Sequence, residues 1–333
     1  MKCNPLLDII IPYYNNEAGL NETLKSIEMQ LNPQIKITIM DDNSDTIPSL
    51  NNHYDLWTSN ENMGPGVQRQ MGMEVTSAPY IMFIDTGDTL LPDGINKVIN
   101  NILSHPDINI FIWPFLINKT LTDELDNHLH GKIYKRDFLN KYNIIFSKPG
   151  SYSNEDVGFN QACRLILEQY DPSSKTILVN NDPIMRYDTI TIDSLTRKDN
   201  HTFIYKKQNL GLAINAIHVF NIGQKNNVST RILNDYVNNV MCSEYFYFYR
   251  TFEERPEFLE QAWDGAKYYY DNLFYIFAQA NKVNTQAVSS RIIKHFKKTS
   301  ENWRPTLPIN IYRFIKDLSS SEKLPEYYLT LKK

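Results

Sequence analysis

Apolar runs alternate with helical periodicities along roughly the first 110 residues of the chain. Runs rich in apolar residues predict four strands, over residues 6–11 (continuous apart from Asp8), 35–40, 80–84 and 108–115. The spacing of apolar residues between these runs predicts three helices, over residues 18–31, 66–76 and 94–103. Asn21 is the N-cap that we predict for the first helix. Such alternation is typical of parallel βαβ units, which bind ligands at the carboxyl ends of their strands.

The pattern changes near residue 200. Long aromatic-rich stretches with helical character follow, over residues 234–253, 256–280 and 285–299. We therefore predict an α/β domain over residues 1–200 and a mainly α-helical C-terminal domain over residues 201–333, which is a candidate for acceptor or partner binding. No window approaches 18 uncharged apolar residues, so we predict no transmembrane segment.

Composition adds a charge asymmetry to this picture. The 333 residues are 42% hydrophobic, which allows a sizeable core, and the formal net charge is −4. Residues 1–200 hold 16 Lys and Arg against 26 Asp and Glu, whereas residues 201–333 hold 18 against 12. One interpretation is that the acidic first part binds a cation and the basic second part binds an anionic partner. The other is that the basic second part consists of ordinary Lys-rich, solvated helices.

Cysteine usage and the N-terminus favour a cytoplasmic location. The three cysteines are far apart and form no CxxC pair, which argues against a disulfide framework or a zinc site. The N-terminus leads into a strand-like run without the features of a secretory signal. We therefore expect a protein of the reducing cytoplasm.

Three acidic clusters carry the candidate chemistry. Asp85 and Asp88 follow the apolar run that ends at residue 84, and Asp41 and Asp42 follow the run that ends at residue 40. A third cluster, at residues 154–156, follows a turn-rich segment. Strand-end carboxylates can hold Mg²⁺ or Mn²⁺ against a substrate phosphate, because these cations prefer oxygen ligands. This pattern indicates an enzyme that acts on an activated, phosphate-bearing substrate.

An ordered set of segments resembles the family 2 glycosyltransferases of the GT-A fold. The segments are residues 9–15 (IIIPYYN), 41–45 (DDNSD), 62–64 (NMG), 69–72 (RQMG), 79–81 (PYI), 85–88 (DTGD), 130–139 (HGKIYKRDFL) and 154–156 (NED). The resemblance covers roughly residues 6–200. It implies a Rossmann-like nucleotide-sugar-binding domain and an inverting enzyme whose donor is a nucleotide-diphosphate sugar, UDP-linked by default.

The resemblance also implies a donor site. Asp42 is expected to hydrogen-bond the nucleobase, with Tyr14 stacked on the ring and Pro12 lining the slot. A carboxylate can accept from the imide N–H of uracil, and an aromatic face suits any base. The alternative for Asp42 is an Asx turn that closes the strand, an assignment that we favour for Asp41. The remaining residues expected at the donor are Asn15, Arg69, Asp85, Thr86 and Gly87.

Asp88 is the expected ligand of the Mn²⁺ or Mg²⁺ cofactor. By resemblance, Asp85 contacts the ribose or orients a metal-bound water, and Arg69 faces the nucleotide or braces the aspartates. The chain departs from the family's Asp-x-Asp-Asp form, because Gly87 stands at the third place. The alternatives are a polar turn for residues 85–88 and a solvated helix surface for Arg69. We assign no histidine as a further ligand, although His201 and His218 lie nearest in sequence to the expected place.

Asp156 is the expected general base, and Glu155 is expected to support it. Inverting transfer needs a carboxylate beside the acceptor hydroxyl, and a positioned base contributes about 10²–10⁴-fold to the rate. The alternative is an acidic pair that stabilises the N-terminus of a helix, and the two assignments are compatible.

The acceptor that the resemblance favours is a bacterial surface glycan or its precursor. A phage-type enzyme that adds sugar to modified DNA bases is an open alternative. Arg291, Lys294 and Lys298 share one helical face, which would suit peripheral membrane contact, a nucleic acid or plain solvent. Two other classes compete: a nucleotidyltransferase, whose Gly-rich phosphate loop the N-terminus lacks, and a catalytically inactive nucleotide-sugar-binding module, which Gly87 would fit.

Overall fold

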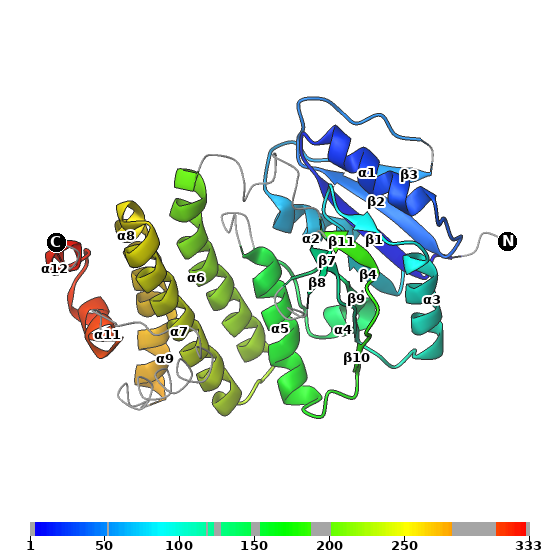
Figure 1. Cartoon of the computed structure of the whole chain (residues 1–333). Helices are drawn as coiled ribbons and strands as arrows, with labels where there is room; N and C mark the ends of the chain where they lie inside the picture. The colour runs from blue at the N-terminus through cyan, green and yellow to red at the C-terminus, as the bar shows by residue number, and fades with distance from the viewer. Residues whose placement is uncertain are drawn as a thin grey trace. The chain divides into compact units, whose positions relative to one another are not determined.

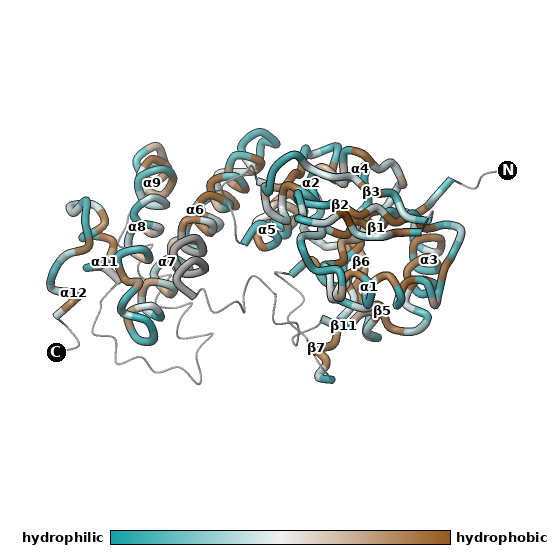
Figure 2. Tube along the Cα trace, turned by 90° about the horizontal axis from the view of Figure 1, so that it is seen from above, coloured by the Kyte–Doolittle hydropathy of each residue, from teal (hydrophilic) through white to brown (hydrophobic). Residues whose placement is uncertain are grey.

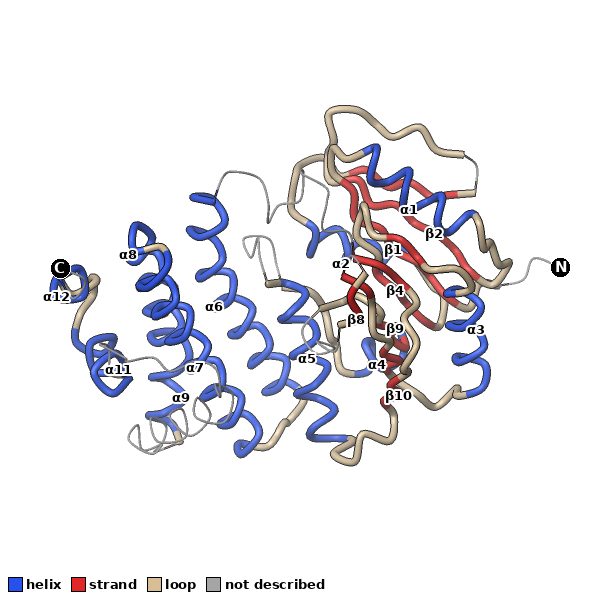
Figure 3. The backbone as a smooth tube through the Cα atoms, viewed as in Figure 1, coloured by secondary structure: helices blue, strands red, loops and turns tan. Residues whose placement is uncertain are grey.

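The chain forms two compact units, Met1–Lys198 and Asp199–Lys333, each described here by itself. The computed structural model describes residues 4–51, 53–117, 119–122, 128–147, 154–187, 201–281 and 311–330, without the side chains of 201–209 and 311–312. The described strands all belong to the first unit, and the second is built from helices (Figure 3).

A seven-stranded sheet with the order β10-β6-β9-β4-β1-β2-β3 forms the centre of the first unit (Figure 1). Its strands are β1 (Leu7–Tyr13), β2 (Ile35–Asp41), β3 (Tyr54–Thr58), β4 (Tyr80–Phe83), β6 (Ile110–Ile112), β9 (Lys132–Lys135) and β10 (Ile177–Val179). The four neighbours β4, β1, β2 and β3 run parallel, whereas β9 is antiparallel to both β4 and β6. The carboxyl ends of β4, β1 and β2 therefore meet at one edge.

Helices cover both faces of this sheet, which explains why its central strands are continuous apolar runs. The helices are α1 (Glu17–Glu28), α2 (Pro65–Val75), α3 (Gly94–Ser104), α4 (Arg136–Lys141) and α5 (Glu155–Tyr170). On one face, Ile9 and Ile11 share a core with α1 and α3. On the other, Gly72 of α2 lies against Ile10, and Phe159 of α5 packs edge-on against Phe83. Figure 2 shows β1 and β2 in the brown of hydrophobic residues.

A second, four-stranded sheet begins directly after Asp88. Its order is β5-β11-β7-β8, with β5 (Thr89–Leu90), β7 (Leu116–Ile117), β8 (Thr120–Leu121) and β11 (Met185–Tyr187). β5 pairs antiparallel with β11, which in turn pairs parallel with β7. This sheet brings the chain near residue 187 back beside the acidic turn at residues 85–88.

The second unit is a helical bundle with an aromatic core. Its described elements are α6 (His201–Lys225), α7 (Thr230–Glu254), the 3₁₀ helix η1 (Pro256–Phe258), α8 (Leu259–Tyr269), the π-helix η2 (Tyr270–Phe274), α9 (Tyr275–Ala280), α11 (Ile311–Ser320) and α12 (Glu326–Thr330). Phe248 of α7 packs with Trp263 of α8 and Phe314 of α11. Among the described helices, none has the length and apolar character needed to cross a membrane.

The predicted fold class, an α/β domain followed by a mainly helical part, is confirmed. Three details differ from the prediction. Asn16, not Asn21, caps α1, because its side chain accepts from the N–H of Gly19 while Asn21 lies inside the helix. The strand predicted over 108–115 is only Ile110–Ile112, and the helix predicted over 256–280 is interrupted by 3₁₀ and π turns. The helix predicted over 285–299 lies outside the described residues.

Candidate active site

The carboxyl ends of β1, β2 and β4 bring the predicted donor-site segments together. Tyr13 pairs with Asp41 in the parallel register, and the N–H of Asp42 donates to the carbonyl of Tyr13. Beside them, the N–H of Ile84 donates to Ile10, so that Asp85 emerges at the same edge of the sheet. Residues from three separate parts of the sequence, around positions 13, 41 and 85, thus meet at one edge of the sheet.

Residues 85–88 form a tight turn, and this turn explains the glycine at position 87. The N–H of Asp88 donates to the carbonyl of Asp85 over 3.0 Å, which closes the turn. Gly87 has φ of +104°, a backbone conformation that turns of this kind need at their third residue and that glycine adopts without strain. The polar turn that we gave as an alternative is therefore present, and it presents both carboxylates.

Two hydroxyl groups fix this turn to its neighbours. Thr86 donates from Oγ1 to the carbonyl of Pro12 in β1 over 2.6 Å. Thr23 of α1 accepts from the N–H of Gly87 over 2.9 Å and donates to the carbonyl of Asp88 over 2.8 Å. The acidic turn is consequently held by a strand and a helix rather than by solvent.

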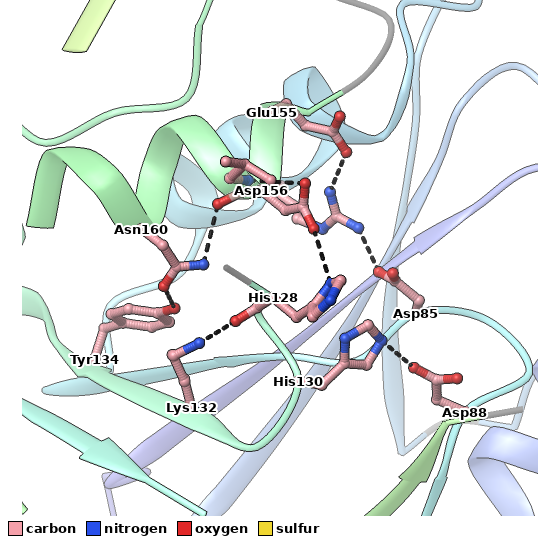
Figure 4. A network of polar contacts seen from close by, with 11 residues as sticks. Asp85, Asp88, His128, His130, Lys132, Tyr134, Glu155, Asp156 and Asn160 are labelled. Carbon is pink, nitrogen blue, oxygen red and sulfur yellow. Dashed lines mark hydrogen bonds and ion pairs between the residues drawn. The ribbon is translucent and has the colours of Figure 1, made fainter. Parts of the chain in front are cut away.

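A candidate metal cluster consists of Asp85, Asp88 and His130, whose ligand atoms all lie within 4.8 Å of one another. His130 Nε2 lies 2.9 Å from Asp88 Oδ2, and the side chains of His130 and Asp88 are only 11% and 4% exposed (Figure 4). Burial alone would lower the pKa of the imidazole, but the hydrogen bond to Asp88 and the charges of Asp88 and Asp85 raise the pKa of His130. Two carboxylates and one imidazole are a donor set that suits a divalent cation.

His130 is the functional candidate that the sequence analysis missed. We had noted residues 130–132 within the family resemblance but had given the histidine no role. The ring is enclosed by Tyr187 and Phe115, at centroid distances of 4.8 and 5.1 Å. The next residue, Gly131, has φ of +67°, and a Cβ atom there would lie 2.3 Å from the carbonyl oxygen of Trp113. The pair His-Gly before a strand was the available signal.

Arg69 connects the acidic turn to the N-terminus of α5. Its guanidinium lies 2.5 Å from Asp85 Oδ1 and 2.8 Å from Glu155 Oε1, and its side chain is only 4% exposed. Burial would lower the pKa of Arg69, but the two carboxylates outweigh it and raise the pKa above its ordinary value. The charge of Arg69 lowers the pKa of Asp85 despite desolvation of that carboxyl. The solvated-surface alternative for Arg69 is therefore wrong, and its ion pair with Asp85 fits the bracing role, whereas its contact with the nucleotide stays a prediction.

Glu155 and Asp156 form the first turn of α5, so the helix N-terminal acidic pair that we gave as an alternative is present. Glu155 is buried against Arg69, and burial raises its pKa. Asp156 is more open, with 25% of its side chain exposed, and its Oδ1 accepts from the N–H of Val157. The two acids therefore differ: Glu155 is bound in a buried ion pair, and Asp156 is partly exposed.

Asp42 lies at the same sheet edge, but its carboxylate already has partners. It accepts from the N–H groups of Met63 and Gly64, each over 2.8 Å, and from Gln68 Nε2 over 2.6 Å. Only 4% of the residue is exposed, and burial raises the pKa of its carboxyl. These bonds fix the loop that leads into α2. The predicted contact with a nucleobase remains a prediction, and any such contact would have to share this carboxylate.

The aromatic side of the predicted donor slot is accessible. Tyr14 is 48% exposed, next to the buried Pro12 and Tyr13. Asn15 donates from Nδ2 to Asp45 and accepts from the N–H of the same residue, which ties the loop after β1 to the loop after β2. Asp41 accepts from the N–H of Ser44, as in the turn that we favoured for it. Tyr14 is thus the predicted donor residue best placed for stacking.

Comparison with known proteins identifies the first unit. Residues 8–155 match the model of Glycosyl transferase family 2. An uncharacterized glycosyltransferase of Haemophilus influenzae is 33% identical over 109 residues, which are 30% of this chain and 44% of that protein. The GalNAc(5)-diNAcBac-PP-undecaprenol beta-1,3-glucosyltransferase of Campylobacter jejuni is 28% identical over 103 residues, 28% of this chain and 33% of that protein. The chain thus spans less than half the length of these curated relatives.

A solved structure extends the likeness to most of the chain. S. aureus TarS 1-349 in complex with UDP-GlcNAc superposes with a TM-score of 0.57 at 17% identity, covering 80% of this chain and 81% of that chain. At this identity the likeness shows the fold alone. The predicted GT-A domain followed by a helical part is confirmed by it.

Proposed function

This chain belongs to glycosyl transferase family 2 through residues 8–155, and we propose on that premise that it transfers a sugar from a nucleotide-diphosphate sugar to an acceptor hydroxyl. The observation that carries the proposal is that the cluster of Asp85, Asp88 and His130 adjoins the ion pairs of Arg69 with Asp85 and Glu155, directly before Asp156 (Figure 4). The site thus combines a candidate metal cluster with a partly exposed carboxylate. A metal-dependent inverting transferase uses both, the cation for the leaving diphosphate and the carboxylate for the attacking hydroxyl.

The metal cluster fits Mn²⁺ or Mg²⁺. His130 Nε2 faces Asp88 at 2.9 Å, so a cation bound there would take the place of the proton between the two side chains. Mg²⁺ is bound through oxygen atoms, whereas an imidazole is better suited to a transition metal, so the set favours Mn²⁺. A bound cation would supply a Lewis acid that stabilises the departing diphosphate.

Asp156 is the general base in this proposal. It takes the proton of the acceptor hydroxyl as that oxygen bonds to the anomeric carbon and the bond from this carbon to the diphosphate oxygen breaks. The acceptor attacks opposite the leaving group, so the anomeric centre is inverted. Glu155 does not share this role, because its carboxylate is paired with Arg69.

The donor and the acceptor classes are suggested by similar proteins. TarS binds UDP-GlcNAc in the structure named above, and the Campylobacter relative is a glucosyltransferase that acts on an undecaprenol-linked glycan. We therefore assign a UDP-sugar as the donor and a bacterial surface glycan or its precursor as the acceptor class.

A thermal-shift screen with UDP-, GDP-, CMP- and dTDP-sugars, each with and without Mn²⁺, tests the proposal. A ligand that binds only the native state stabilises it by about 2.7 kcal/mol at a hundredfold excess over Kd. We expect a Mn²⁺-dependent shift with one nucleotide class that disappears in Asp88→Asn. The matched control is Asp107→Asn, an exposed acid of the same unit outside the cluster. No shift with any nucleotide sugar would contradict the transferase and favour another class.

A further inference from the structure

The carboxylate of Asp156 has one oxygen fixed by the protein and one that faces a histidine. Oδ1 accepts from the N–H of Val157 over 2.8 Å. Oδ2 lies 3.8 Å from Nδ1 of His128, and His128 is 44% exposed (Figure 4). Both side chains are more open than the neighbouring pair of His130 and Asp88, which are 11% and 4% exposed. The oxygen that is free to act as a base therefore opens toward an accessible imidazole.

The position of His128 is set by the fold. Its carbonyl accepts a hydrogen bond from Nζ of Lys132, a buried residue at the start of β9. Its ring stands edge-on to Phe115 at 6.2 Å and lies 5.8 Å from the ring of His130. A buried cation thus anchors the main chain of His128, and an aromatic contact orients its ring. A histidine at this place is not a loosely placed surface residue.

The distance between the two side chains is informative. At 3.8 Å, Nδ1 and Oδ2 are too far apart for a direct hydrogen bond, and an exposed ion pair of this length contributes little to stability. An oxygen atom can, however, lie at about 2.8 Å from both atoms at once. The pair is therefore spaced to hold one hydroxyl group between them.

We propose that the attacking hydroxyl binds between Asp156 Oδ2 and His128 Nδ1, which makes His128 an acceptor-binding residue of the transfer reaction; this rests on the proposed function and on Asp156 as its base. The hydroxyl donates its proton to Oδ2, and Nδ1–H donates to a lone pair of the hydroxyl oxygen. The remaining lone pair forms the bond to the anomeric carbon as the bond to the diphosphate breaks. The proton ends on Asp156, and His128 keeps its own.

In this proposal the segment 128–130 contacts both the leaving group side and the acceptor side of the reaction. His130 belongs to the candidate metal cluster at the diphosphate side, and His128 faces the base at the acceptor side. The two rings come from one short segment and lie side by side (Figure 4). A single stretch of chain would in this way set the distance between the leaving group and the nucleophile.

The test uses the full chain, Mn²⁺ and the nucleotide sugar that gives the largest thermal shift, with water as the nucleophile and release of the nucleoside diphosphate as the readout. His128→Leu removes the N–H donor, whereas His128→Asn places an amide N–H close to the position of Nδ1. His53→Leu is the control, an exposed histidine near the start of β3. Donor KM and Mn²⁺ affinity are measured for each variant.

We expect His128→Leu to lower kcat about 10–100-fold, because it removes the group that orients the nucleophile. Donor KM and Mn²⁺ affinity should stay within about twofold of the parent, because His128 does not contact the donor or the cation in this proposal. His128→Asn should recover most of the rate, and His53→Leu should change nothing. A parent-like rate for His128→Leu, an equal loss for His128→Asn, or a parallel loss of Mn²⁺ affinity would each overturn the inference. If Asp156→Asn abolishes hydrolysis while His128→Leu does not, only this inference fails; a parent chain that neither binds nor hydrolyses a nucleotide sugar removes the proposed function itself.

Discussion

At the scale of single residues, the candidate site depends on contacts between side chains that lie far apart along the chain, such as those of Arg69 with Asp85 and Glu155. Asp85, Asp88 and Asp156 stand in motifs whose spacing can be recognised along the chain. His130 and His128 could not be assigned in that way, because neither a lone histidine nor a His-Gly pair carries the information that the spacing of two acids does. Their role depends on a turn that brings residue 130 to Asp88, more than 40 positions away. The burial of Arg69 could not be predicted either, because helical periodicity does not show which carboxylates from distant parts of the chain contact a polar residue.

Arg69→Met should strongly destabilise the first unit. It leaves the buried carboxylate of Glu155 without its partner, and breaking a buried ion pair typically costs about 3–5 kcal/mol. The free energy of unfolding in urea measures the effect. The control is the double variant Arg69→Met/Glu155→Gln, which should be more stable than Arg69→Met because an amide is less costly to bury than an unpaired carboxylate. A double variant that is no more stable would contradict the role assigned to the ion pair.

Asp156→Asn should separate binding from chemistry. The amide keeps the size of the side chain but cannot take a proton, so turnover should fall about 10²–10⁴-fold. Donor and Mn²⁺ binding should be retained, since Asp156 lies outside the cluster of Asp85, Asp88 and His130. Single-turnover hydrolysis and thermal shift in parallel provide the measurement. Loss of donor binding together with turnover would place Asp156 in the donor site instead.

At the scale of elements, apolar runs were predictable and polar strands were not. The runs that became β1 and β4 are buried along their whole length and that of β2 along most of it, so their sequences are mainly apolar. β9 went unrecognised because it is short and begins and ends with a lysine, one of which is buried. The edge strand β3 was not predicted because much of it is exposed, so it lacks a continuous apolar run. β9 is the strand that positions His130. Because β9 was not predicted, neither was the place of His130 in the site.

Gly131→Ala should disturb the start of β9 and the metal cluster together. A Cβ atom would meet the backbone of Trp113, and the left-handed backbone adds strain of about 1–2 kcal/mol to an overpacking cost of about 1–3 kcal/mol. We expect a stability loss of about 2–5 kcal/mol and weaker Mn²⁺ binding, measured by urea unfolding and by Mn²⁺ titration. An alanine variant with parent-like stability and metal affinity would show that the turn tolerates a side chain.

At the scale of the whole molecule, the candidate chemistry lies in the first unit. The network around Arg69 and the match to the family model belong to the first unit, whereas the second is a bundle with a core of aromatic side chains. The change of pattern near residue 200 was visible in the sequence because helical periodicity and aromatic content both rise there. The sequence does not show the function of the helical unit. The structure adds nothing on its basic face around Arg291, because that segment lies outside the described residues. The assignment of this unit to acceptor or partner binding stays a prediction.

One buried acid in the helical unit predicts how its stability depends on pH. Glu244 of α7 is 1% exposed, and among the described residues neither carboxylate oxygen has a hydrogen-bond partner. Burial raises the pKa of Glu244 from 4.5 to about 8, so the folded state holds a proton that the unfolded state releases. Its contribution to stability is therefore complete below pH 4.5 and is lost as pH rises toward 8, by up to about 1.4 kcal/mol per pH unit.

Glu244→Gln should remove this pH dependence, because an amide does not ionise. The free energy of unfolding of the parent chain should fall between pH 5.5 and pH 8.5 relative to that of the variant, measured by urea unfolding at both pH values. The difference between the two proteins cancels contributions from the first unit, which the substitution does not touch. Glu260→Gln, an exposed acid at the start of α8, should leave the pH dependence unchanged. Parallel pH profiles for the parent and Glu244→Gln would mean that Glu244 is ionised and solvated in the folded protein, and that the core of the helical unit is open to water at this point.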